Sequence, residues 1–310
     1  MRKNAIFRII IWSIVLVLLV SILSSALFLR TRRLSSHSPA ETAIPSPIAA
    51  PEDGTGEVTR TEAISLDPRQ IREIGIEWAA GSITIQPAEV DSIQISEAAV
   101  SESKYAMVWK QSGDKLTIRY SENNGLDFHF GITINDVISK DLTILVPLGW
   151  ECDSLEVDAA SATLGVKNLT IREVDFDGAS GVCTFENCVI DQLDLDTASG
   201  DIYFTGTLET LDCDAASASV IAVFDNVPSR IDMDSMSGDL DITLPSDAGY
   251  TVTMDALSSD FISDFSCSQR GDSYYYGNGK CQISMDAMSG DVYLREHKEA
   301  DAVSAAPTAP

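Results

Sequence analysis

The sequence has few basic residues for its length. Of 310 residues, 21 are Lys or Arg and 47 are Asp or Glu, which gives a net charge of −26. Six of the bases lie in the first 33 residues, where there is no acid, so residues 34–310 carry 15 bases against 47 acids, a net charge of −32. A body this acidic cannot neutralise phosphates, which excludes nucleic acid as a partner. Cationic ligands and basic surfaces stay possible.

Signatures of catalysis are also missing. The sequence contains 3 histidines, His37, His129 and His297, and their spacing fits neither a zinc site nor a catalytic triad. Gly277-Asn-Gly279 lacks the strand–helix context of a phosphate loop and indicates a turn. Carboxylates are abundant, but they recur in every repeat, whereas catalysis needs one distinctive site. We therefore expect a protein that is not an enzyme and has no cofactor.

One long segment contains no charge at all. Ile9 to Leu29 is uninterrupted and apolar apart from scattered serines, and at 1.5 Å per residue it spans roughly 30 Å, the thickness of a bilayer core. A cleaved signal peptide is the alternative, but its apolar region runs only ~7–15 residues. The sequence predicts a single-pass anchor through which the chain contacts the membrane.

Composition then divides the chain into four parts. Residues 1–33 are the transmembrane anchor with basic flanks, and residues 34–60 are a Pro/Ser-rich spacer that cannot bury a core. Residues 61–296 carry the β-repeat pattern, and residues 297–310 form a disordered tail. The basic residues on the two sides of the anchor nearly balance, so the positive-inside rule does not decide its orientation.

The body repeats a pattern best seen in Leu193 to Ile202, where apolar and acidic residues alternate up to a Ser-Gly pair. The serine, called the marker serine below, recurs after gaps of 19, 19, 18, 20, 21 and 31 residues. It stands at Ser161, Ser180, Ser199, Ser217, Ser237, Ser258 and Ser289. An aspartate stands three residues before each one, at Asp158, Asp177, Asp196, Asp214, Asp234, Asp255 and Asp286. A fixed period near 20 is typical of stacked repeats that bury apolar faces against their neighbours.

Alternation with a period of two makes the repeat a β unit. Two columns point inward: Leu155, Val174, Leu193, Leu211, Ile231, Val252 and Ile283, and then Val157, Phe176, Leu195, Cys213, Met233, Met254 and Met285. The acids between them point outward, and Ser-Gly supplies a corner that tolerates positive φ. The expected fold is all-β, a β-solenoid like a parallel β-helix.

The two ends of the repeat region differ from its middle. Ile74 to Ile85 has the form of a degenerate first rung, with Glu77 in the aspartate position. Alternating strands at Tyr105–Trp109, Lys115–Tyr120, Asp127–Ile134 and Leu142–Val146 indicate a β cap. Near the other end, residues 265–281 predict a hairpin or loop.

These motifs together resemble the bacterial putative-adhesin family. The resemblance covers roughly Ile71 to Arg295 and is carried by the repeated Asp-x-x-Ser-Gly-Asp-Ile pattern, Ala80-Gly81-Ser82, Val146-Pro147, Leu244-Pro245 and Gly277-Asn-Gly279. Ala162, Ala218 and Ser259 depart from it by replacing the corner glycine. The resemblance implies a parallel β-helix behind a membrane segment and a role in surface interaction, with no catalytic residues.

Three functions follow from this, in order of preference. The first is a membrane-anchored surface or envelope protein that binds through its repetitive face, with the N-terminus in the cytoplasm and the repeat domain outside. The second is a regulatory or stress-sensing component bound to another membrane protein. The third is a carbohydrate-active enzyme, because β-helices can host one.

In four consecutive repeats the aspartates are doubled. The eight residues, called the acidic wall below, are Asp175, Asp177, Asp194, Asp196, Asp212, Asp214, Asp232 and Asp234. Residues i and i+2 share a face, so two parallel columns are expected. Calcium could bridge them, but strands hold carboxylates about 7 Å apart along the chain, and a solvated face is the preferred interpretation. The aspartate three residues before each marker serine is expected to bond the corner amides, as in an Asx-turn.

The 6 cysteines fall into two groups. Four occupy apolar positions of the repeat and are expected to be small buried hydrophobes, although adjacent rungs could let some of them bond: Cys152, Cys183, Cys188 and Cys213. Cys267 and Cys281 flank the predicted hairpin, where a disulfide is the preferred interpretation.

Overall fold

The computed structural model describes residues 59–60, 64–99, 106–121 and 139–297. The chain separates into two compact units, Met1–Gly54 and Thr55–Pro310, and every described residue belongs to the second. The described part consists of β-strands and one 3-10 turn, Pro68–Gln70. The all-β prediction is confirmed.

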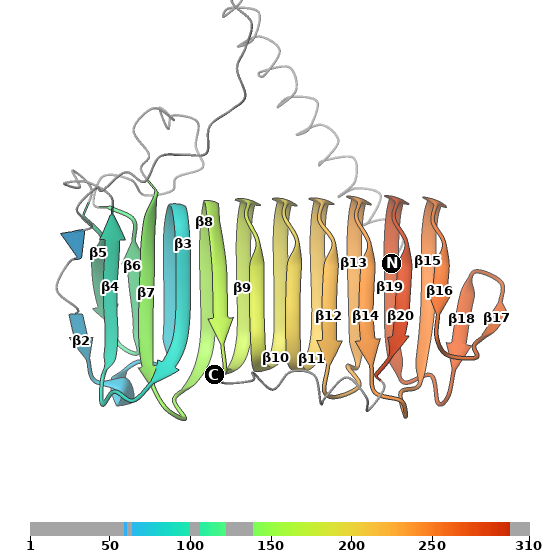
Figure 1. The fold of residues 1–310 in the computed structure, drawn as a ribbon, viewed down its shortest axis with the longest axis horizontal. Coiled ribbons are helices and arrows are strands. Elements are labelled where there is room, and N and C mark those ends of the chain that lie inside the picture. Colours follow the sequence, from blue (N-terminus) through green and yellow to red (C-terminus); the bar gives the residue numbers. More distant parts are fainter. Residues whose placement is uncertain (1–58, 61–63, 100–105, 122–138, 298–310) are drawn as a thin grey trace, which may run out of the picture. The chain divides into compact units, whose positions relative to one another are not determined.

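Parallel strands form the middle of the stack (Figure 1): β8 (Glu151–Lys167), β9 (Thr170–Ser180), β10 (Cys183–Ser199), β11 (Ile202–Ser217), β12 (Val220–Phe224), β13 (Arg230–Ser237) and β14 (Leu240–Leu244). Leu193 pairs with Val174 on one side and with Leu211 on the other, and Leu211 pairs with Ile231. Each turn of the chain therefore lies beside the turn 18 to 20 residues away, as the spacing of the serines predicts. The strand segment that ends at each marker serine is called the first half-rung, and the strand segment that follows the serine is called the second.

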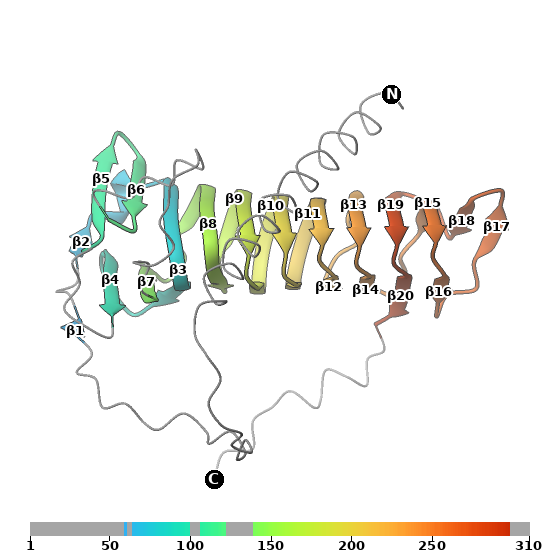
Figure 2. The ribbon, with the colours of Figure 1, turned by 90° about the horizontal axis from the view of Figure 1, so that it is seen from above.

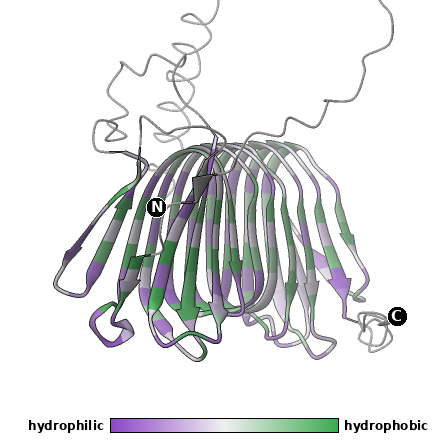
Figure 3. Ribbon diagram, turned by 60° about the vertical axis from the view of Figure 1, so that its left-hand side comes forward, coloured by the Kyte–Doolittle hydropathy of each residue, from purple (hydrophilic) through white to green (hydrophobic). Residues whose placement is uncertain are grey.

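The two predicted inward columns form the core. All of their residues are buried except Met254, which is partly buried and packs against the others. Hydropathy alternates along each strand accordingly (Figure 3). On the second half-rungs the rings of Phe185, Phe204 and Phe224 follow one another with centroids 6.4 and 5.6 Å apart. Each repeat thus buries its apolar side chains between its own two half-rungs and against the adjacent repeats.

Where the corner residue has positive φ, glycine is required, because successive rungs touch there. Gly200 has φ +126°, and a Cβ on it would lie 1.7 Å from the carbonyl oxygen of Gly181 in the rung below. Gly238 is similar, 1.8 Å from the carbonyl oxygen of Ala218. The only described non-glycine residues with positive φ are Asn168 and Asn187. Ala162, Ala218 and Ser259 therefore turn the corner without the left-handed conformation, which explains how these rungs do without glycine.

The N-terminal end is a cap, as predicted. Its strands are β1 (Thr59–Arg60), β2 (Ile64–Leu66), β3 (Glu73–Ala88), β4 (Ile93–Ala99), β5 (Val108–Ser112), β6 (Lys115–Arg119) and β7 (Lys140–Pro147). Strand β3 is the first rung, and Glu77 pairs with Asp158 of β8. Strand β4 runs antiparallel to both β7 and β2, and this ends the parallel stacking. The predicted strand Asp127–Ile134 lies outside the described residues, and β1 consists of residues 59 and 60, the last two of the segment predicted as spacer.

The C-terminal end departs from sequence order. Its strands are β15 (Tyr250–Ser258), β16 (Phe261–Ser263), β17 (Ser268–Arg270), β18 (Ser273–Tyr276), β19 (Cys281–Ser289) and β20 (Val292–Glu296). The last repeat inserts one place early: β19 lies between β13 and β15, and β20 lies between β14 and β16 (Figure 1). The predicted hairpin is β17–β18. It pairs antiparallel with the outer edge of β15 and lies at the opposite end of the stack from β5 and β6 (Figure 2).

Several expectations fall outside the described residues. They are the anchor Ile9 to Leu29, the spacer up to residue 58, the tail from residue 298, and His37 and His129. Within the part that is described, there is no helix of sufficient length and apolar character to cross a membrane.

Candidate functional site

The acidic wall lies on the outer face of the first half-rungs. Pairing aligns Asp175, Asp194, Asp212 and Asp232 in one column. The same pairing aligns Asp177, Asp196, Asp214 and Asp234 in the second, and none of the eight residues is buried. The two parallel columns thus lie where the period of two puts them. Strand spacing in a sheet brings neighbouring carboxylates of one column to within about 4.8 Å.

This crowding changes how readily the carboxyl groups ionise. Partial burial, and then repulsion from neighbouring acids, raises the pKa of Asp158 and of Asp196 to about 6. The same two causes, in the same order, raise the pKa of Asp175, Asp194 and Asp286. Asp196 in the wall and Asp158 next to it therefore gain protons between pH 7 and pH 5, where isolated aspartates stay ionised.

A metal centre is not assembled in this region. Among the residues that the structure describes, no group of three or more His, Cys, Asp or Glu side chains is arranged to hold a metal ion. In the wall, Asp232 pairs with Arg230 of its own strand. The eight wall residues thus form a charged surface, and the described geometry offers no calcium cage.

At four corners the structure shows hydrogen bonds from a column that the sequence analysis did not single out. In the described part of the chain, no side-chain hydrogen bond joins Asp158, Asp177, Asp196, Asp255 or Asp286 to a corner amide. Instead, at four of the seven corners the residue two positions after the marker serine accepts a bond from the adjacent rung. The distances are 3.3 Å (Ser219 N to Asp201), 3.2 Å (Asp239 N to Ser219), 2.8 Å (Asp291 N to Asp239) and 2.8 Å (Asp260 N to Asp291).

The sequence contains a signal for this ladder of hydrogen-bonded residues. Its acids are the Asp of the Ser-Gly-Asp motif, which the sequence shows at three of the seven corners, whereas the aspartate three residues before the serine stands at all seven. Asp and Ser side chains often bond nearby backbone N–H groups, and here the bond crosses to the neighbouring rung. Asp201, Asp239 and Asp291 are therefore the structural aspartates of the corner.

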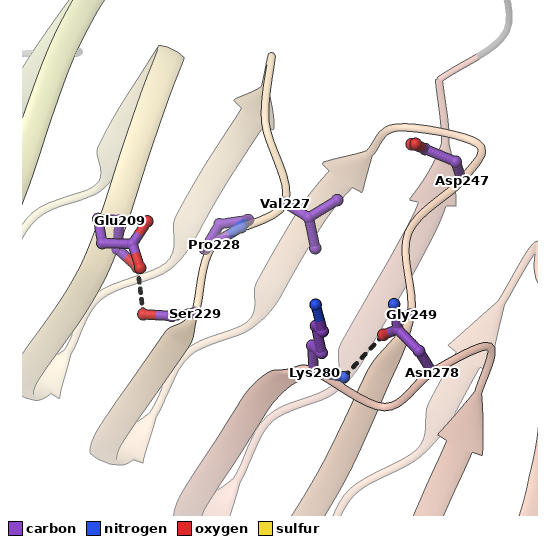
Figure 4. Close-up of a pocket in the computed structure, with 8 residues that line it drawn as sticks. All are labelled: Glu209, Val227, Pro228, Ser229, Asp247, Gly249, Asn278 and Lys280. Carbon is purple, nitrogen blue, oxygen red and sulfur yellow. Dashed lines mark hydrogen bonds between the residues drawn. The ribbon is translucent and has the colours of Figure 1, made fainter.

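One concave site lies on the side of the stack opposite the Ser-Gly corners. It has a volume of about 490 Å³ and lies between the loops that lead into β13, β15 and β19 (Figure 4). Its lining combines two acids with one lysine: Glu209, Val227, Pro228, Ser229, Asp247, Gly249, Asn278 and Lys280. Ser229 Oγ donates to the carbonyl oxygen of Glu209 at 3.0 Å, and Lys280 N donates to Asn278 Oδ1 at 3.0 Å. The cleft exists because the last repeat passes back beside β13.

A buried ion pair that the sequence analysis missed lies in the N-terminal cap. Lys140 Nζ is 2.8 Å from Glu97 Oε2, and the two side chains are 0% and 4% exposed. Lys140 also donates to the carbonyl oxygen of Tyr120 at 2.6 Å and lies over the rings of Trp78 and Tyr120. Burial lowers the pKa of Lys140, and the hydrogen bond and charge of Glu97 oppose that shift. No spacing in the sequence links residues 97 and 140, because antiparallel pairing of β4 with β7 brings them together.

The cysteines are all free thiols. Cys152, Cys183, Cys188 and Cys213 are buried, as expected of apolar positions in the repeat. Burial raises the pKa of the Cys183 and Cys213 thiols to about 12. Cys267 is half-buried and Cys281 is buried, and the disulfide predicted between them is not formed in the structure. The sequence places the two on either side of the hairpin, but flanking positions do not by themselves bring two side chains into bonding geometry.

Several solved structures are similar to this chain, and three of them follow. No curated protein matches the chain. A putative adhesin from Parabacteroides distasonis superimposes with a TM-score of 0.42 at 13% identity, covering 78% of this chain and 98% of that one. A putative adhesin from Bacteroides fragilis has a TM-score of 0.38 at 12% identity, covering 76% and 97%. A putative cell adhesion protein from Clostridium sporogenes has a TM-score of 0.36 at 10% identity, covering 78% and 100%.

The family profile covers the whole stack. The Toastrack DUF4097 profile matches residues 71–295, from the first rung β3 to the end of the last rung β20. These are the residues over which the sequence resembles the bacterial putative-adhesin family. The chain therefore belongs to the Toastrack DUF4097 family.

Proposed function

We propose that this protein is a non-catalytic, membrane-anchored protein of the cell surface or envelope that binds its partners through the outer face of a β-solenoid. One observation carries the proposal: four consecutive rungs present the same pair of carboxylates in register. A repeated surface suits extended binding, because each rung adds an equivalent contact, whereas a catalytic site needs one unique arrangement. The role in surface interaction that the sequence resemblance implies agrees with this class of function.

The charge of the body points to the chemistry of the partner. Residues 34–310 carry a net charge of −32, and such a surface attracts basic partners and repels acidic ones. The proposal places Ile9 to Leu29 in the membrane, the N-terminus in the cytoplasm and the rungs outside, held off the bilayer by the Pro/Ser spacer.

Placement is tested by cysteine labelling. Five of the six native cysteines are buried, so the background variant needs only Cys267→Ser. Thr163→Cys then adds an exposed thiol on β8, and Asn4→Cys adds one before the anchor. A membrane-impermeant maleimide should label the Thr163→Cys variant in intact cells and the Asn4→Cys variant only after lysis. The reverse pattern would overturn the proposed orientation.

Binding is tested with cells that display the full chain. They should attach to glass coated with lysozyme, a basic protein, more than to glass coated with albumin, an acidic one. Replacing Asp175, Asp194, Asp212 and Asp232 together by Asn should remove that difference. Attachment that does not depend on these four residues would contradict binding through the wall.

A further inference from the structure

The last three rungs of the stack carry an exposed apolar ridge on their corners. Met236, Met288 and Leu257 immediately precede the marker serines of β13, β19 and β15, and their side chains are 36%, 54% and 84% exposed. The same position in the earlier rungs holds Ala160, Ala179, Ala198 and Ala216. Large apolar groups therefore replace alanine at one end of the stack only. The geometry of the corner does not require a large side chain, because the rungs with alanine turn the same corner.

Strand register places the three side chains in one row. Ser235 pairs with Ala287 and Ser237 with Ser289, and these pairs bracket Met236 and Met288. In the same way, Ala256 and Ser258 pair with Ala287 and Ser289 on either side of Leu257 and Met288. Adjacent strands lie about 4.8 Å apart, so the row from Met236 to Leu257 is about 10 Å long.

Acids border this ridge on both sides. Two residues earlier on each strand is an aspartate, and the three are paired across the rungs: Asp234, Asp286 and Asp255. Beyond the corner are the aspartates of the hydrogen-bonded ladder: Asp239, Asp291 and Asp260. The surface thus presents an apolar row between two acidic rows, all fixed on β-strands or their corners.

We propose that this ridge binds an amphipathic helix of a partner protein, with an apolar stripe and Lys or Arg on both flanks. Helical residues at i, i+4 and i+7 lie on one face and span about 10.5 Å, which matches the length of the ridge. Basic flanks complement the acidic rows. A second copy of this chain would set acid against acid, and an anionic lipid surface would be repelled for the same reason. The inference rests on the proposed binding function and specifies the partner for one part of the surface.

The test uses the full chain in neutral-detergent micelles and a fluorescent helical peptide. The peptide has leucines at i, i+4 and i+7 and lysines or arginines on both sides of them, and binding is measured by fluorescence anisotropy. Leu257→Ser should weaken binding about tenfold, because a buried leucine contact is lost. Leu148→Ser is the matched control, since Leu148 is 66% exposed in the loop that leads into β8, and it should leave the affinity unchanged.

Three further variants and a vesicle-binding measurement decide the remaining outcomes. Asp255→Asn should weaken binding at low salt and lose its effect at high salt. Unchanged affinity in the Leu257→Ser variant would overturn the proposal, and a Met288→Ser variant repeats the test if Leu257→Ser lowers the unfolding temperature. Tighter peptide binding after Arg30, Arg32 and Arg33 are replaced by Gln would also overturn it, because the chain's own basic segment would then occupy the ridge. Binding to phosphatidylglycerol vesicles that requires Leu257 would overturn it in favour of a membrane.

The outcome is separable from that of the proposed function. Leu257→Ser leaves the acidic wall intact, so attachment to lysozyme-coated glass should persist in this variant. Failure of the ridge with preserved attachment would refute only the helix partner. Loss of wall-dependent attachment would refute the proposed function itself.

Discussion

The two ends of the stack stop the parallel pairing of rungs by different physical means. At the N-terminal end, antiparallel strand β4 covers a fully buried ion pair, Lys140 with Glu97, in contact with the rings of Trp78 and Tyr120. The C-terminal end carries no such pair among its described residues. Hairpin β17–β18 covers β15 there. The ring of Tyr250 packs against the rings of Phe265 and Tyr276, with 5.6 Å between the ring centroids in each pair.

The contrast indicates that the two ends differ in how specifically they pack as well as in how they stabilise the stack. A buried charge pair loses its hydration energy, and the attraction between the two charges offsets only part of that loss. An aromatic cluster stabilises the fold through the apolar area that it buries. A lysine that must reach one glutamate and one carbonyl oxygen permits few alternative packings. We therefore expect the N-terminal cap to fix where the first rung begins, and the aromatic end to close the stack more tolerantly.

The largest effect is expected from breaking the ion pair. Lys140→Ala removes the Lys140 ammonium group from the buried Glu97 carboxylate, so the free energy of unfolding should fall by about 3–5 kcal/mol. Urea denaturation of the full chain in micelles measures this loss. The double variant Lys140→Met with Glu97→Gln should recover at least half of it, because the amide oxygen introduced by Glu97→Gln can still accept the hydrogen bond from Met107 N. A double variant as unstable as Lys140→Ala would show that the cap depends on charge for stability as well as for specificity.

At the other end, Tyr276→Ala should have a smaller effect. The ring of Tyr276 is partly buried against Tyr250 and Phe265, and its removal should lower the free energy of unfolding by about 2 kcal/mol. Tyr203→Ala is the matched control in the middle of the stack, where the side chain is 41% exposed, and it should change stability by about 0.5 kcal/mol or less. Equal losses in the two variants would mean that the aromatic cluster has no special role in closing the end.

Between the two ends, the crowded carboxyl groups of Asp158 and Asp196 should make stability depend on pH. The folded-state pKa of Asp158 and of Asp196 is raised to about 6, against about 3.9 for an unfolded aspartate. The folded chain thus binds more protons in this window, and stability rises as pH falls from 7 to 5. Scanning calorimetry should show a higher unfolding temperature at pH 5, and Asp196→Asn should reduce that rise. A lower unfolding temperature at pH 5 would contradict the effect of crowded carboxylates.

The smallest effect concerns the hairpin at the aromatic end. Cys267 and Cys281 are free, so Cys267→Ser should change the free energy of unfolding by less than about 1 kcal/mol. Thiol counting on chain purified without reductant gives the sharper measurement. One thiol, that of half-buried Cys267, should react quickly in the folded chain, and all 6 should react after denaturation. Only 4 reactive thiols after denaturation would show that the flanking pair forms a disulfide after all.

Much of the fold followed from local pattern. The alternation of apolar and acidic residues predicted the inward columns and the parallel wall, because a strand has only two faces and one must be buried. The bonds that Asp201, Asp239 and Asp291 accept at the corners were not predicted, since the aspartate three residues before the serine is the more regular of the two columns. Only the distance between rungs decides which carboxylate reaches an amide, and in the structure it is the one in Ser-Gly-Asp.

The sequence by itself determined the period, the faces of each strand and the acidic character of the outer surface, since these depend on neighbours along the chain. Tertiary structure alone decided that β19 inserts between β13 and β15. The last three first half-rungs carry similar inward residues, so any order of stacking buries them equally well, and the exposed edge of β15 becomes covered only when the hairpin folds onto it. Likewise, Lys140 and Glu97 lie 43 residues apart in the chain. Antiparallel pairing of β4 with β7 brings the two side chains together. Each can then be buried, because a buried charge is costly without an opposite charge beside it.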